Sequence, residues 1–146
     1  MIGFNHGLVG GLIGKFVPLP LAIPLAFVSH FILDALPHYG MPHEMRDASR
    51  FWKLFFTIDA FATLGLAIWA IHFEHYAMFF GGLAAVFPDF IWVAKVIKHR
   101  TFRLNHHNTG FERWHIAIQK HEYRWALWVE LLLAAILFYV VVMHTT

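Results

Sequence analysis

Three apolar segments, each about long enough to cross a membrane, most constrain what this chain can fold into. Residues 54–71, 76–94 and 126–143 are almost entirely apolar, and each approaches the ~20 residues that a helix needs to cross the hydrocarbon region. Lipid offers no hydrogen-bonding partner to the backbone, so segments of this kind are predicted to be helical. We expect residues 1–146 to form a single transmembrane domain, an all-α polytopic integral membrane bundle.

The first third of the chain is predicted to form a helical hairpin, residues 1–36. A Gly-rich arm, with Asn5 as a candidate N-cap, is interrupted by Pro18 and Pro20, and a second apolar arm ends before Pro37. Because the first arm is short, the sequence leaves open whether the hairpin crosses the membrane fully. Together with the three longer spans, it gives an expected bundle of four to five helices.

The basic residues predict the orientation of the bundle. Ten of the eleven Lys and Arg residues fall within residues 37–53 and 95–125, whereas Lys15 falls on the opposite side. The positive-inside rule places these loops at the cytoplasmic face, with the N-terminus on the same side. Thr109 and Glu112 form a capping-box pattern, which predicts a short cytoplasmic interfacial helix within the second loop.

The composition agrees with a membrane protein and narrows its chemistry. Apolar residues make up 59% of the chain and aromatic residues 18%, and there is no Cys, which excludes disulfides and thiolate ligands. The formal charge of +2 arises from the loop clusters and does not indicate nucleic-acid binding. The expected partners are membrane lipid and, as alternatives, other membrane proteins or further copies of this chain.

Several acids fall at one depth within the apolar spans. Asp59, Asp89 and Glu130 each lie six residues from a basic residue at the predicted cytoplasmic boundary, which is about 9 Å along a helix. Asp34 lies near the end of the second arm of the hairpin. Carboxylates are costly in hydrocarbon and usually face a bundle interior, so this shared level predicts one common site.

The strongest local motif is His30 followed by Asp34. Their i, i+4 spacing puts both side chains on one face of a helix. The pair can bind one metal ion, or the carboxylate can orient the imidazole through a hydrogen bond. His38 follows the helix-ending Pro37 and could bend back over the same site. A purely structural hydrogen-bonded pair is the alternative, and the apolar setting favours ligation.

A second motif is Pro88 followed by Asp89. Pro88 removes a helical hydrogen bond and predicts a kink, which opens backbone next to an intramembrane acid. An ordinary kink, with Asp89 bonded to a neighbouring side chain, is the alternative. His6, near the start of the first arm, can approach the same level or remain an interfacial residue.

These residues define a candidate metal centre. The candidate ligands are His6, His30, Asp34, His38, Asp59 and Asp89. Asp59 and Glu130 have a second interpretation, as hydrogen-bond acceptors for a ligating His or as ion-pair partners. Sets of His and carboxylate suit Zn²⁺ best, with Mn²⁺ or Fe as alternatives, and one or two ions can be held.

Two loop histidines are candidate catalytic residues. His107 and His115 lie in the predicted cytoplasmic loop, where either could protonate a leaving group. Pairs of metal ions commonly serve phosphoester hydrolysis. The surrounding basic residues could attract a phosphate headgroup, although anchoring to anionic lipid explains them as well and is favoured.

The motifs resemble those of the bacterial inner-membrane metal-dependent hydrolases, a family distantly similar to zinc-dependent phospholipases C. The matching positions are His6, Ser29, His30, Asp34, Pro37, Gly40, Pro42 and the run Phe87, Pro88, Asp89. The resemblance implies a bacterial cytoplasmic membrane location and His6, His30, Asp34 and Asp89 as metal ligands. The family continues its Pro-Asp with a further Asp and His, where this chain has Phe90 to Trp92, and the order of the motifs differs.

Three functions remain open from the sequence. The first is a membrane metal-dependent hydrolase acting at the cytoplasmic face on a phosphoester, either lipid-borne or free. The second is a non-catalytic subunit of a larger membrane complex, in which the intramembrane acids pair with partner residues. The third is haem binding by two facing His, which the many carboxylates at this level disfavour.

Overall fold

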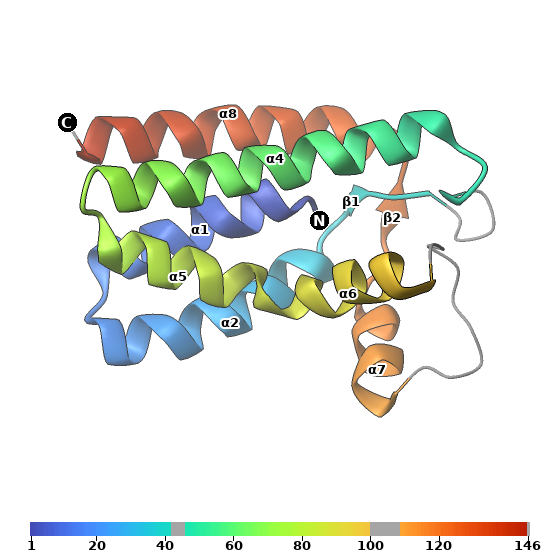
Figure 1. Ribbon diagram of the computed structural model, residues 1–146, viewed down its shortest axis with the longest axis horizontal. Helices are drawn as coiled ribbons and strands as arrows, with labels where there is room; N and C mark the ends of the chain where they lie inside the picture. The colour runs from blue at the N-terminus through green and yellow to red at the C-terminus, as the bar shows by residue number, and fades with distance from the viewer. Residues whose placement is uncertain (42–45, 100–108, 146) are drawn as a thin grey trace.

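The computed structural model describes residues 1–41, 46–99 and 109–145, and this part of the chain is mostly helical (Figure 1). The helices are α1 (Gly3–Phe16), α2 (Leu19–Ala35), α4 (Arg50–His72), α5 (Tyr76–Val86), the 3₁₀ turn η1 (Phe87–Asp89), α6 (Phe90–His99), α7 (Gly110–Ile118) and α8 (Ala126–Thr145). Two short strands, β1 (His38–Tyr39) and β2 (Glu122–Tyr123), pair in parallel.

Three helical segments are long and apolar enough to cross a membrane, as the sequence predicts. They are α4, the continuous run α5–η1–α6 (Tyr76–Lys98) and α8. The sequence predicts a bundle of four to five helices plus a short interfacial helix, and of the described helices only these three segments are long and apolar enough to cross a membrane. Helix α2 is apolar but has 17 residues, and α1 has 14. The break between them falls at Val17 and Pro18, and Pro20 lies in the first turn of α2, where proline is tolerated. The all-α fold with three potential spans, as in a membrane protein, is therefore confirmed in its coarser form.

The first helix begins earlier than the sequence predicts. Asn5 lies inside α1, which starts at Gly3, so its assignment as the N-cap is wrong. Its side chain instead donates to the backbone carbonyl of Glu130 at 3.2 Å. The first N–H groups of a helix lack partners within that helix, and here they are bonded by acids from other helices, as described below.

Close contact between α1 and α5 forms the centre of the bundle. Gly10 lies against the backbone of Gly81, and Gly14 lies against the backbone of Ala77. A Cβ on either Gly10 or Gly14 would overlap those backbone atoms. Small residues thus permit the close helix approach that the glycine spacing predicts.

The kink predicted at Pro88 is present as the 3₁₀ turn η1, which joins α5 to α6. Proline has no N–H to continue the α-helical ladder, and the turn changes the direction in which the following side chains point. As a result, Asp89 lies at the junction between the two helices.

The predicted interfacial helix is α7. Its capping box is formed: the Thr109 side chain accepts from the Glu112 N–H at 3.3 Å, and the Glu112 side chain accepts from the Thr109 N–H at 2.6 Å. Lys95 of α6 binds the other Glu112 oxygen at 2.7 Å. In Figure 1, α7 and the paired strands lie at one end of the bundle, and the C-terminus lies at the other.

A buried histidine and aspartate cluster

Three helices and one 3₁₀ turn bring histidine and aspartate side chains together inside the protein. His6 comes from α1, His30 and Asp34 from α2, and His115 from α7, and all four are almost completely buried. Asp89 of η1 reaches the edge of the group, where its carboxylate lies 3.8 Å from His30. The structure thus joins His30 and Asp34, which are neighbours on one helix face, to residues far away in the sequence.

The Asp34 carboxylate lies at the centre of the cluster. One oxygen lies 3.1 Å from His6 Nε2 and accepts from the α-amino group of Met1. The other oxygen lies 3.2 Å from His30 Nε2, 2.9 Å from His115 Nε2 and 2.8 Å from the Gln119 amide nitrogen. Each neighbour is therefore a hydrogen-bond donor or an imidazole nitrogen, as expected around a buried carboxylate.

The hydrogen bonds of His30 leave its Nε2 unprotonated and able to bind a metal ion. Its Nδ1 lies 2.8 Å from the carbonyl oxygen of Ala85, near the end of α5. A carbonyl can only accept, so Nδ1 carries the proton and Nε2, which faces Asp34, presents a lone pair. This arrangement, with the outer nitrogen bonded to a backbone carbonyl, is typical of histidine ligands in metal sites.

The hydrogen bonds of His115 favour the opposite tautomer. The indole N–H of Trp92 donates to His115 Nδ1 at 3.3 Å. An indole N–H can only donate, so Nδ1 accepts and a neutral His115 carries its proton on Nε2. That nitrogen faces Asp34 and lies 3.0 Å from His30 Nε2. His115 is therefore arranged to donate a proton inside the cluster.

The side chains present fit a divalent metal ion. Among the described residues, two overlapping groups of candidate ligands occur: His6, His30 and Asp34, and His30, Asp89 and His115. Bonds of about 2.0–2.1 Å to a tetrahedral ion place neighbouring ligand atoms ~3.3 Å apart, close to the 3.1 and 3.2 Å that separate the Asp34 oxygens from His6 Nε2 and His30 Nε2. His6 Nδ1 is buried without a hydrogen-bond partner among the described residues, so a change of its tautomer breaks no bond at that nitrogen.

Asp59 and Glu130 lie outside both candidate ligand groups and bond the start of α1 instead. The two Asp59 oxygens accept from the N–H groups of Gly3 and Phe4 at 2.8 and 3.0 Å. Glu130 accepts from Ile2 at 2.8 Å and from Tyr39 at 2.7 Å. Carboxylates at a helix N-terminus satisfy free N–H groups and oppose the positive end of the helix dipole. Of the acids predicted to share one depth, Asp34, Asp59 and Glu130 bond the first residues of the chain, in two different roles, whereas Asp89 lies beside His30.

The other predicted site residues lie apart from the cluster. His38 belongs to strand β1. Its Nδ1 donates to the Leu36 carbonyl at 2.8 Å, and its Nε2 lies 3.8 Å from Glu122 of β2. His107 lies outside the described residues. Of the two candidate catalytic histidines, His115 is the one that the described chain places in the cluster.

Two residues of the cluster do not feature in the sequence prediction. Gln119 bonds Asp34, and Trp92 bonds His115. Gln119 is four residues after His115 and thus on the same helix face, which the sequence could have revealed. Trp92 carries no such signal, because α6 and α7 meet only in the tertiary structure.

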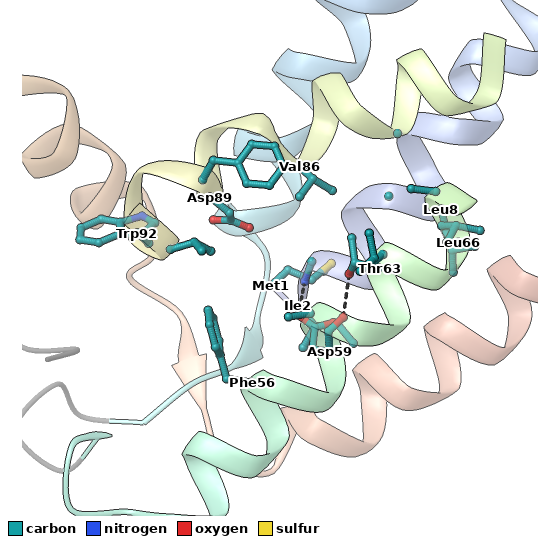
Figure 2. A pocket seen from close by; sticks show the side chains of 18 of the residues that line it. Met1, Ile2, Leu8, Phe56, Asp59, Thr63, Leu66, Val86, Asp89 and Trp92 are labelled. Carbon is teal, nitrogen blue, oxygen red and sulfur yellow. Dashed lines mark hydrogen bonds between the residues drawn. The ribbon is translucent and has the colours of Figure 1, made fainter. Parts of the chain in front are cut away.

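A cavity of about 470 Å³ extends from the edge of the cluster into the bundle. Figure 2 shows Asp59 of α4 and Asp89 of η1 on its walls, with Trp92 toward one side and Leu8 and Leu66 toward the other. Three residues that line the cavity also contact residues of the cluster: Met1, Asp89 and Gln119. The cluster is thus reached from the cavity past these three residues.

No protein-family model, curated protein or solved structure matches this chain.

Proposed function

We propose that this chain is an integral membrane metal-dependent hydrolase that acts on a phosphoester. The observation that carries the proposal is the convergence of three His Nε2 atoms on the buried Asp34 carboxylate, beside a cavity that reaches Asp89. Burying these groups is unfavourable without compensation, and a bound cation would add to what the Met1 amino group gives Asp34. The resemblance to bacterial inner-membrane metal-dependent hydrolases points to the same chemistry.

His6, His30 and Asp34 are the proposed ligands, with Asp89 closing the site. The two candidate groups share His30, which has a single nitrogen free for coordination, so we infer one ion. Zn²⁺ matches a set of His and carboxylate best, and Mn²⁺ or Fe fit less well. A bound divalent ion would supply Lewis acidity, which makes water a nucleophile and offsets charge on a phosphoester.

The protein's own groups supply the remaining steps. The His115 Nε2 proton is placed to pass to the leaving oxygen, while Trp92 holds the ring in that tautomer. Gln119 donates to Asp34 and keeps that carboxylate oriented toward the histidines. The buried setting excludes bulk water, which strengthens each of these interactions.

We place the site at the cytoplasmic face of a bacterial inner membrane. The basic loops that the sequence assigns to the cytoplasm include β1, α7 and β2, which lie at one end of the bundle (Figure 1). Lys15 bonds the backbone of His144 at the opposite end. The distribution of charge along the chain thus agrees with the arrangement of the helices.

Replacing Asp34 by Asn tests the proposal. The change keeps the shape of the side chain but removes the charge that balances a cation, so we expect bound metal and phosphoester hydrolysis to be lost together. Elemental analysis of purified protein measures the first, and hydrolysis of p-nitrophenyl phosphate or phosphatidic acid the second. The matched control is Glu74→Gln, at an exposed residue, which should change neither. A fully metallated, active Asp34→Asn protein would exclude the proposal.

A second candidate is a non-catalytic subunit of a membrane complex. It is favoured by the hydrogen bonds of Asp34 to His115, Gln119 and the Met1 amino group, which together satisfy the carboxylate without a metal. The same measurement decides between the two. Wild-type protein that is stable, monodisperse and free of metal would support the structural role.

A further inference from the structure

The cavity beside the cluster is long and follows helix α4. Its lining includes α4 residues from Trp52 to Ala70, a separation of about 27 Å at 1.5 Å per residue. The volume of about 470 Å³ lies within the roughly 300–1,000 Å³ of typical ligand pockets. The cavity is therefore narrow for its length, which suits an extended chain better than a compact molecule.

Small side chains keep this space open. Gly7 and Gly11 of α1 face it, together with Ala60 and Ala67 of α4. A Cβ on Gly7 would lie 3.3 Å from the Leu66 side chain, and one on Gly11 would meet no atom closer than 3.6 Å. These glycines differ from Gly10 and Gly14 in that they border the cavity and a Cβ on either would not overlap helix backbone.

Helix α4 has few buried residues along the cavity. Its buried residues are Trp52 and Ala70, near its two ends. Side chains between them that point outward, such as Phe61 and Ile68, are 70% and 58% exposed and suited to lipid. The cavity is thus enclosed by a helix that itself faces hydrocarbon, so acyl chains are the apolar molecules nearest to it.

Polar groups are unevenly distributed along the cavity. Arg46, Gln119 and Asp89 line the end near the cluster. Farther along, Asp59 is bonded to the start of α1, and Thr63 donates to the Asp59 carbonyl at 2.8 Å. Beyond them the lining is apolar, with Leu66, Trp69 and Met78. One polar end and a long apolar interior correspond to the two parts of a lipid.

We propose that this cavity binds one acyl chain of a membrane phospholipid, with the phosphate at the polar end, where Arg46 supplies positive charge beside Asp89 and Gln119. The hydrocarbon core of a bilayer is about 30 Å thick, so one acyl chain covers about 15 Å of it, and the cavity is long enough to take the whole chain. That the bound lipid is then hydrolysed rests on the proposed function, whereas binding of the chain does not.

The test compares alkyl phosphates of two lengths on protein washed free of metal. The variant Ala67→Phe fills the apolar part of the cavity, and its neighbour Ile68→Phe adds a ring of the same kind on the lipid-facing side. Native mass spectrometry counts bound hexadecyl phosphate and octyl phosphate on detergent-released protein. We expect Ala67→Phe to lower the bound fraction of hexadecyl phosphate at least tenfold, to affect octyl phosphate less, and Ile68→Phe to match wild type.

A second variant covers the case in which Ala67→Phe does not fold. Gly7→Ala narrows the cavity from α1, next to the Leu66 side chain, and should likewise weaken hexadecyl phosphate binding selectively. Wild-type protein that binds no hexadecyl phosphate, or variants that bind both lengths as wild type does, would overturn the proposal. Because the protein carries no metal in these measurements, a failure here leaves the Asp34→Asn result independent.

Discussion

At the scale of single residues, the position of each proton decides what the cluster can do. The Ala85 carbonyl fixes the His30 proton on the outer nitrogen, and the Trp92 indole fixes the His115 proton on the inner one. Two histidines that contact the same carboxylate are thereby suited to different proposed tasks, ligation for His30 and proton donation for His115. Sequence spacing alone does not distinguish them, because both partners come from other helices.

The variant His115→Gln separates these two tasks. Gln can still hydrogen-bond Asp34 but cannot transfer a proton, so we expect the bound metal to remain and kcat to fall by about 10²-fold or more. His72→Gln, at an exposed position, should behave as wild type. Metal content and steady-state hydrolysis are measured on the same samples. Loss of metal in the His115 variant would make that residue a ligand instead.

The sequence predicts which acids lie at the same depth in the membrane, but it does not predict which of them contact histidines and which accept from backbone N–H groups. Asp34 and Asp89 lie beside histidines. The i, i+4 spacing of His30 and Asp34 predicts their contact on one helix face. Asp59 and Glu130 instead accept from backbone N–H groups of residues 2 to 4. Backbone groups have no signature in the sequence, so this part of the site could not be predicted.

At the scale of helices, the strongest patterns predict the structure best. The long apolar segments, the break at the two prolines and the capping box of α7 are local properties, and the structure contains all of them. The start of α1 differs from the prediction because its capping groups come from α4 and α8 instead of Asn5. Tertiary capping of this kind overrides the local signal.

The contact between α1 and α5 yields a prediction about stability. Gly10→Ala places a Cβ into the Gly81 backbone, and overpacking of this kind destabilises by about 1–3 kcal/mol. Gly65→Ala, on α4, meets no atom within 4 Å and should stabilise by about 0.5–1 kcal/mol through helix propensity. Thermal unfolding in detergent measures both. Equal effects of the two substitutions would contradict the proposed packing role of Gly10.

The docking of α7 onto α6 should depend on pH through Glu112. Burial opposes ionisation of this carboxyl, but hydrogen bonds from Lys95 and Thr109 outweigh it and lower its pKa. Because the folded pKa lies below the unfolded value of about 4.3, the stabilisation is complete above that value and is lost as pH falls through the folded pKa. Hydrogen-exchange protection of α7, corrected for intrinsic rates, should decline over this acidic range. Glu112→Gln should remove the pH dependence.

At the scale of the whole molecule, one end of the bundle is polar and the other carries few charges. The polar end holds α7 and the paired strands, while the turn after α4 and the end of α8 lie at the opposite end (Figure 1). This uneven distribution of charge can be predicted from the sequence, because most of the Lys and Arg residues lie in the loops at residues 37–53 and 95–125. The cavity between α1, α4 and α5 could not be predicted, because it results from how three helices pack.

The absence of cysteine makes the orientation measurable. His72→Cys places a thiol at the end of α4, and His121→Cys places one at the polar end, both at exposed positions. With the basic loops in the cytoplasm, a membrane-impermeant maleimide added to intact spheroplasts should label the His72 variant. It should label the His121 variant only after permeabilisation. The reverse pattern would put the cluster at the outer face of the membrane, where a substrate in the inner leaflet could not reach it. That result would contradict hydrolysis at the cytoplasmic face.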